Sequence, residues 1–310
     1  MIETRPSPTL EDLRGSASRR RREALIRRLF LAAAAVSVLV SALIVTSLIG
    51  RAVTFLTLIH PTQLLAGGWF PRQGDFGIPT LLAGTFIVTA IGMAVAIPLG
   101  LGAAMYLSEY AKPRMRRVLK PALEVLAGIP SVVMGFFALN VISPDLVREL
   151  FGGATIFNLA AAGIGVGILV TPLIASVAED AMFAVPASLR EASYGLGARK
   201  RITSLQVVFP AAVSGIVAAV ILGISRAIGE TMVVAIAAGA TGNSLFTLNP
   251  LHYGQTMTTA MSSLAIGSDT VGGVAAAVPS LFFVGLLLFS LTFALNLVAD
   301  RFVRRVRERY

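Results

Sequence analysis

This chain contains six long, predominantly apolar segments, separated by polar or charged residues. A helix needs about 20 apolar residues to cross the roughly 30 Å hydrocarbon core of a bilayer, and every segment reaches this length. The runs are continuously apolar rather than alternating, which favours helices over the strands of a membrane barrel. We therefore predict an all-α integral membrane protein with six transmembrane helices, at residues 29–50, 80–108, 121–143, 156–178, 207–238 and 277–299.

The first segment follows a basic stretch, an order that a cleaved signal peptide also shows. The apolar core of a signal peptide spans only about 7–15 residues. Here residues 29–50 form a run of 22 without a charge, so we expect a retained anchor. Residues 1–28 and 300–310 are predicted to be basic cytoplasmic tails around a transmembrane domain at 29–299, and the first tail to be disordered.

Composition supports a membrane protein, since 55% of the residues are hydrophobic and only 14% are charged. A net charge of +10 is typical of a protein that binds nucleic acid, but here most of the basic residues lie in the segments between and beyond the predicted spans. Of the 26 Lys and Arg, eight lie in 1–28, five in 109–120, four in 179–206 and five in 300–310. Cytoplasmic loops are rich in Lys and Arg. Both termini are therefore predicted to be cytoplasmic, with anionic lipid headgroups rather than nucleic acid as the contact.

No cofactor and no metal site are expected. The chain has no cysteine, and its two histidines, His60 and His252, lie far apart in the sequence. No Gly-Lys dipeptide occurs, which excludes the G-x-x-x-x-G-K-[ST] phosphate loop, so any nucleotide must be hydrolysed by another chain. The run GIGVG is interpreted instead as a face on which Gly163 and Gly167 let two membrane helices approach closely.

The connection at 179–206 carries the most specific motif. It includes the order E-A-S-x-x-x-G, from Glu191 and Ala192 to Gly197, and the hydrophobic run that begins ten residues later at Val207 ends at Pro210. Small side chains at Ala192 and Ala198 would let a short helix seat in a groove of a partner, and Gly197 would permit a turn that a Cβ opposes. Glu191 and Arg199 would supply a polar rim. The spacing resembles the loop that couples ABC importer permeases to their ATPase; an ordinary amphipathic surface helix is the alternative.

The fifth segment contains charges inside a predicted span, in the string SRAIGET. Arg226 and Glu230 are four residues apart and so share one face of a helix. A charge in the bilayer costs several kcal/mol, on the order of 2.5 or more, unless it faces a cavity or a partner. One interpretation is a structural ion pair between the two residues.

In the other interpretation, which we prefer because intramembrane charges are typically functional, Arg226 presents its fork of donors to a tetrahedral oxyanion. Glu230 would accept a hydrogen bond from the anion, and Ser225 and Thr231 would add hydroxyl groups. Phosphate near neutral pH still carries a proton to donate and sulfate does not, so a carboxylate would select between them.

Three strings together resemble one family: RAIGET, EVLAGIPSVVMG at 124–135, and WFPRQGDFGIPTLLAGT at 69–85. They are similar to phosphate ABC transporter permeases of the PstC type, with the sister PstA type as the nearest alternative, over about 69–305. The resemblance implies the type I ABC importer permease fold in the bacterial inner membrane. It also implies a heterodimer with a sister permease, two ATP-binding subunits, an extracytoplasmic phosphate-binding protein, and an anion path lined by Arg226 and Glu230.

Glu124 and Ser131, in the third segment, are candidates for a supporting role. Glu124 follows Pro121, so its carboxylate could stabilise the start of a helix, or it could take part in transport. The predicted function is a phosphate permease subunit that works by alternating access and catalyses no covalent step. A permease for molybdate, sulfate or phosphonate, or an ion-driven secondary transporter, remains an alternative. A membrane enzyme is disfavoured because no metal cluster or nucleophile–base pair is evident.

Overall fold

The computed structural model describes residues 17–239, 243–266 and 274–306, and the chain divides into two units, before and after Gly50. Most of helix α2 (Ala17–Leu58) makes up the first unit. Its most apolar window has a mean hydropathy of 2.6. The helix begins inside the segment predicted as a tail, because Arg is a good helix former; residues 1–16 lie outside the described part.

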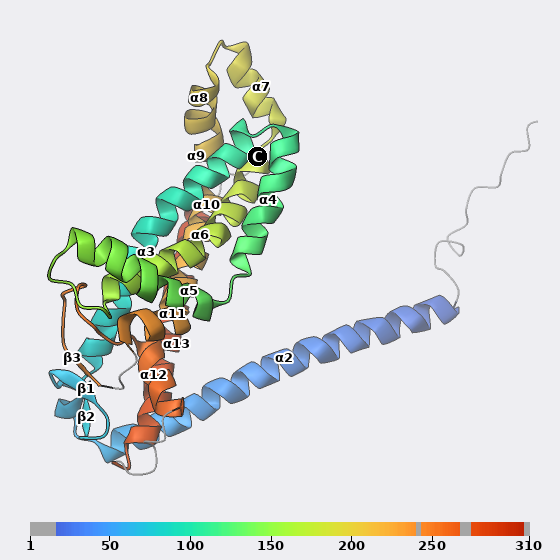
Figure 1. The fold of residues 1–310 in the computed structure, drawn as a ribbon. Coiled ribbons are helices and arrows are strands. Elements are labelled where there is room, and N and C mark those ends of the chain that lie inside the picture. Colours follow the sequence, from blue (N-terminus) through green and yellow to red (C-terminus); the bar gives the residue numbers. More distant parts are fainter. Residues whose placement is uncertain (1–16, 240–242, 267–273, 307–310) are drawn as a thin grey trace, which may run out of the picture. The chain divides into compact units, whose positions relative to one another are not determined.

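The second unit contains the rest of the fold (Figure 1). Its elements in chain order are η1 (Pro61–Leu65), β1 (Gly68–Phe70), β2 (Asp75–Phe76), α3 (Ile78–Met105), η2 (Tyr106–Tyr110), α4 (Pro113–Ala127), α5 (Ser131–Phe137), η3 (Ala138–Arg148), α6 (Leu159–Phe183), α7 (Ala187–Gly195), α8 (Lys200–Ile202), η4 (Thr203–Val208), α9 (Phe209–Ala211), α10 (Val213–Gly229), α11 (Met232–Val234), η5 (Ala235–Gly239), β3 (Ser244–Leu245), α12 (Met257–Ile266) and α13 (Ala277–Val306). The segments η2 to η5 are π-helical.

Helices of membrane length account for most of the chain. Among the described residues, five helices are long and apolar enough to cross a bilayer, and six if the bent pair Lys200–Ala211 and Val213–Gly229 is one span. The prediction of an all-α membrane protein is therefore confirmed. Helix α13 continues past the predicted end of its span at residue 299 as far as Val306.

The centre of the second unit is the contact between α3 and α6, which run side by side (Figure 1). A Cβ on Gly163 would lie 2.7 Å from Cβ of Ile91, and one on Gly167 would lie 2.6 Å from the backbone oxygen of Gly92. Neither site has room for a side chain. The predicted close packing at Gly163 and Gly167 is confirmed, and it is a contact between these two helices.

The third predicted span, 121–143, is wrong in its position. Helix α4 begins at Pro113, within the predicted loop, and ends at Ala127, and a separate segment of membrane length runs over Ser131–Arg148. Pro130 disfavours helical backbone at the residue before it and cannot donate to the preceding turn, so the helix ends there. The polar first half of α4 stays helical because its basic side chains find carboxylate partners, described below.

The fifth predicted span, 207–238, is not one straight helix. The chain bends by 71° between Lys200–Ala211 and Val213–Gly229, and helix α10 ends at Gly229. Glu230 has extended backbone, with φ −70° and ψ 128°. Arg226 and Glu230 therefore do not lie on one face of a continuous helix, contrary to the prediction.

Three strands form a small antiparallel sheet in the order β2-β1-β3. Trp69 pairs with Phe76 across the sheet, and their rings meet edge to face with centroids 5.8 Å apart. Both rings are fully buried, together with Phe55 from the end of α2. Figure 1 shows that this sheet and the helices α7 and α8 lie at opposite ends of the second unit.

Candidate functional site

The predicted coupling segment forms a short helix, α7, followed by a tight turn. Gly197 has a φ of +80°, a backbone conformation that L side chains rarely adopt. The turn is closed by backbone hydrogen bonds, from Gly197 N to Tyr194 O at 2.9 Å and from Ala198 N to Ser193 O at 3.1 Å. The prediction that Gly197 supports a turn is confirmed.

The remaining residues of the predicted motif lie around this turn. Glu191, Ala192 and Arg199 are exposed, and Ala198 is half-buried. Next to Gly197, Leu196 has 90% of its surface exposed. Sequence reasoning missed Leu196, although a large apolar residue beside an obligatory turn is the signal that would have found it. The tip thus presents an apolar side chain with charged neighbours.

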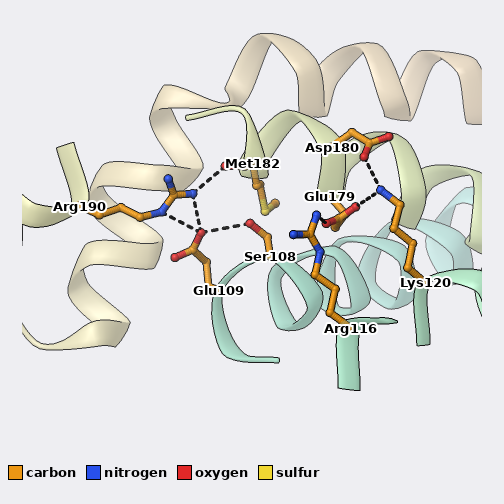
Figure 2. A network of polar contacts seen from close by, with 8 residues as sticks. All are labelled: Ser108, Glu109, Arg116, Lys120, Glu179, Asp180, Met182 and Arg190. Carbon is orange, nitrogen blue, oxygen red and sulfur yellow. Dashed lines mark hydrogen bonds and ion pairs between the residues drawn. The ribbon is translucent and has the colours of Figure 1, made fainter. Parts of the chain in front are cut away.

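A network of polar side chains joins α7 to the ends of α3 and α6, and Figure 2 shows it from close by. The guanidinium of Arg190 donates from Nη2 to Oε1 of Glu109 at 2.9 Å. It also donates to the backbone oxygen of Met182 at 2.8 Å and of Val185 at 2.5 Å. Ser108 donates to the same Glu109 oxygen at 3.1 Å. One cation therefore contacts three segments of the chain.

A second part of this network joins α4 to α6 (Figure 2). Glu179 is fully buried, and its two carboxylate oxygens accept hydrogen bonds from Arg116 and, at 2.7 Å, from Lys120. Lys120 also donates to Asp180 at 2.5 Å. Arg116 stacks on the ring of Phe183, with its central carbon 3.6 Å from the ring centroid. A buried carboxylate is thus paired on both oxygens, as a charge removed from water requires.

The pKa of Lys120 reflects these contacts. Burial lowers this pKa, but the hydrogen bonds and charges of Asp180 and Glu179 outweigh it and raise the pKa above its usual value of 10.5. Lys120 is therefore cationic at every physiological pH.

Sequence reasoning did not find this network. Its charged residues occur at the ends of apolar runs, where the Lys and Arg indicate only topology and the acids carry no signal of their own.

Of the four residues predicted to form the anion path, Arg226 alone has an exposed side chain. Among the described residues, the side chain of Arg226 forms no hydrogen bond or ion pair, with Glu230 or with any other group. Ser225 donates its hydroxyl to Asn296 of α13 at 3.2 Å, and Thr231 donates to the backbone oxygen of Gly229 at 3.3 Å. The structural ion pair considered above is therefore absent from this structure.

Glu230 has a local structural role. The residue is 9% exposed, and Oε1 accepts a hydrogen bond from the backbone N–H of Val233 at 3.4 Å. The hydroxyl of Thr258, from α12, donates to the backbone oxygen of Glu230 at 2.9 Å. The break in the helix is thus stabilised from both sides, since a helix end leaves backbone groups that need partners.

The supporting residues Glu124 and Ser131 lie on either side of the break after α4. Glu124 is in the last turn of α4, so the interpretation that it stabilises a helix start is wrong. It lines a cavity of about 600 Å³ together with the basic residues Arg116, Arg117 and Lys120. Ser131 is the first residue of α5, directly after Pro130.

The sequence of residues 96–308 matches the model of a known family, described as the inner membrane component of binding-protein-dependent transport systems. This chain belongs to that family. Membership favours the importer permease over the secondary transporter and the enzyme.

Relatives agree with this assignment. The chain is 36% identical over 219 residues to the probable ABC transporter permease protein YqgH of Bacillus subtilis, covering 70% of each chain. It is 32% identical over 263 residues to the phosphate transport system permease protein PstC of Haemophilus influenzae, covering 79% of this chain and 81% of the relative. The PstC protein of Mesorhizobium japonicum is 32% identical over 268 residues, covering 79% of each. The resemblance of this permease to the PstC type is confirmed.

Solved structures support the fold. The permease aligns with a chain of the MetNI methionine ABC transporter, in inward-facing conformations, with a TM-score of 0.54 at 22% identity, covering 75% of this chain and 95% of the other. A crystal structure of an amino acid ABC transporter with histidines aligns with a TM-score of 0.51 at 18% identity, covering 74% and 94%. At these identities the likeness shows the type I importer permease fold alone.

Proposed function

We propose that this permease forms the path of inorganic phosphate in an ATP-driven importer of the bacterial inner membrane. The observation that carries the proposal is the exposed Arg226 in the last turn of α10, an apolar helix. A guanidinium without a partner is expensive in lipid. It is tolerated where a polar path or another protein chain faces it.

Phosphate is favoured over other solutes by the relatives, several of which are phosphate permeases of the PstC type over more than three quarters of this chain. Arg226 would attract the anion and replace part of its hydration with a fixed fork of donors. Glu230, four residues further on, would accept a hydrogen bond from a protonated phosphate oxygen or set the local field. Ser225 and Thr231 would need to exchange their present hydrogen bonds to contact the anion.

The path would form between this chain and a sister permease, the partner that would cover the face carrying Arg226. Two ATP-binding subunits would hydrolyse ATP on the cytoplasmic side, where α7 and the exposed Leu196 would dock. An extracytoplasmic binding protein would deliver phosphate at the opposite end of the chain. Both termini would be cytoplasmic, as the distribution of Lys and Arg favours.

The test is uptake of labelled phosphate by the assembled complex in vesicles, normalised to folded protein, for Arg226→Gln, Glu230→Gln and the double variant. If Arg226 binds the anion, the Arg226→Gln and double variants fold but lose uptake, because no cation offsets the desolvation of phosphate. Arg114→Gln, a change of an exposed Arg in α4, is the matched control and keeps uptake. Robust uptake by the double variant would contradict the proposed path.

A permease for a different oxyanion is the second candidate, because the printed name of the Bacillus subtilis relative specifies no substrate. Labelled sulfate and molybdate in the same assay distinguish the two. If phosphate is the substrate, Glu230→Gln reduces discrimination against sulfate or shifts the pH dependence of uptake. Preferential uptake of sulfate or molybdate by the unmodified complex would identify the other oxyanion permease.

A further inference from the structure

Arg190 occupies a position that the proposed coupling function does not by itself explain. It lies on α7, yet the hydrogen bonds of its side chain are all with residues outside that helix: Glu109 at the end of η2, Met182 in the last turn of α6, and Val185. Its side chain is 19% exposed and that of Glu109 only 3%. Figure 2 shows the guanidinium between the two helix ends.

These contacts attach α7 to η2 and α6, and a second polar contact, between the hydroxyls of Ser193 on α7 and Thr203 at 2.9 Å, attaches it to η4. None of its residues is buried, so apolar packing holds it weakly; half-buried Leu189 is its contribution to the neighbouring apolar cluster. Within the described residues, no ion pair other than Arg190–Glu109 reaches α7. The guanidinium is planar and donates in fixed directions, so three acceptors around it define one orientation.

The geometry points to Arg190 as the positioning residue that carries movement of α7 into the membrane helices, with α7, η2 and the end of α6 moving as one body. The inference rests on the proposed function, because it needs an ATPase to act on α7. Displacing α7 would pull on a charged partner and two carbonyl groups at once. The hydrogen bonds of Arg190 would thus provide a direct physical connection between α7 and the membrane helices, which closeness in space alone would not.

The same body extends to α4. Glu179 lies on α6 one turn before Met182, and it is held by Arg116 and Lys120 of α4. The last turns of α6 therefore carry both parts of the network. Movement that enters at Arg190 would pass through α6 to α4, which ends at the break before Pro130.

The first experiment compares Arg190→Met with Arg114→Met in the complete transporter, reconstituted with its binding protein and inorganic phosphate. Arg190→Met keeps most of the side-chain length and removes the donors. We expect phosphate transported per ATP hydrolysed to fall about tenfold for Arg190→Met, with basal ATP hydrolysis retained. Arg114→Met leaves the ratio unchanged. An unchanged ratio for Arg190→Met would overturn the inference.

Glu109→Gln keeps the interpretation testable if Arg190→Met fails to assemble. The amide retains an oxygen acceptor but loses the charge. The complex should therefore assemble, and its ratio of phosphate transported to ATP hydrolysed should lie between that of Arg190→Met and that of Arg114→Met. A ratio equal to that of the unmodified complex would show that the Arg190–Glu109 charge pair transmits nothing.

The second experiment replaces the ion pair with a covalent link, which is feasible because the chain contains no cysteine. The double variant Glu109→Cys with Arg190→Cys should be uncoupled, and a short bifunctional thiol reagent should restore transport per ATP. A monofunctional reagent is the control and should restore nothing. If the bridge blocks transport, α7 must separate from η2 during the cycle. That result would overturn the inference that α7, η2 and the end of α6 move as one body.

The two proposals fail in different ways. If the unmodified complex takes up no phosphate, the proposed function is wrong. If it takes up phosphate and Arg190→Met retains full coupling, the function stands and only the role of Arg190 is wrong.

Discussion

Lys120 of α4 donates to the carboxylate of Glu179 on α6 at 2.7 Å, and Glu179 is fully buried. The two residues belong to helices separated in sequence by the whole of α5 and η3. Arg116 occupies the other oxygen of the same carboxylate. The contact explains why the polar first half of α4 is a helix rather than a loop.

Glu179→Ala should destabilise the second unit strongly. Truncation leaves Arg116 and Lys120 without their buried counter-charge, and breaking such a pair typically costs about 3–5 kcal/mol. The cost here should be roughly 2–3 kcal/mol, because the side chains of both cations are about a quarter exposed and can hydrate. Thermal unfolding of the purified chain in detergent measures it. Glu149→Ala, at an exposed acid, is the control; equal loss in both variants would contradict this reading.

The ion pairs of Lys120 should be insensitive to pH near neutrality. The pKa of Lys120 is raised above 10.5 in the folded chain, chiefly by Asp180 and Glu179 against the opposing effect of burial. For a raised pKa, the stabilisation is complete below the unfolded pKa of about 10.4 and is lost as pH rises through the folded pKa. The stability difference between the native chain and Lys120→Met should thus be constant from neutral pH to about pH 9 and shrink only above about pH 10.5. A difference that disappears already near neutrality would be inconsistent with this assignment.

Gly197 should tolerate substitution only by residues that accept positive φ. A Cβ there meets no atom within 4 Å, so the penalty is backbone strain alone, about 1–2 kcal/mol for an ordinary residue. Gly197→Asn should retain ATP-dependent uptake, and Gly197→Val should lose most of it at normal membrane abundance. Gly195→Ala is the matched control, since Gly195 lacks positive φ and also has open space. Full uptake by Gly197→Val would show that this turn is not needed.

Gly167→Ala should disrupt the contact between α3 and α6. The new Cβ would lie 2.6 Å from the backbone oxygen of Gly92, which cannot move without shifting α3. Overpacking of this kind costs about 1–3 kcal/mol. Gly102→Ala in α3, where nothing lies within 4 Å, should leave thermal stability unchanged or slightly raised. Equal stability of the two variants would argue against close helix contact at Gly167.

Single cysteines in this cysteine-free chain should report the proposed orientation. Leu196 is 90% exposed and Leu65 is 77% exposed, so in the permease expressed without its ATP-binding subunits a thiol at either position is accessible to reagent. Leu196→Cys should react with a membrane-impermeant maleimide only after the membrane is opened, and Leu65→Cys should react in intact cells. The opposite pattern would reverse the orientation and remove α7 from the side where ATP is hydrolysed.

The sequence by itself determined the membrane class, most of the spans, the turn at Gly197 and the close packing at Gly163 and Gly167. These features are local. Twenty consecutive apolar residues favour a lipid-spanning helix whatever surrounds them. A glycine likewise carries its conformational freedom, or its lack of bulk, wherever the chain places it.

Tertiary structure alone decided the network around Glu179 and Arg190 and the break at Glu230. Glu109 and Arg190 are 81 residues apart, and Arg116 and Glu179 are 63 apart, so no local pattern shows which charges meet. At the helix break, the backbone oxygen of Glu230 accepts a hydrogen bond from Thr258, 28 residues further along the chain. A burial cost depends on which partners the fold supplies, and sequence periodicity carries no information on partners that come from other helices.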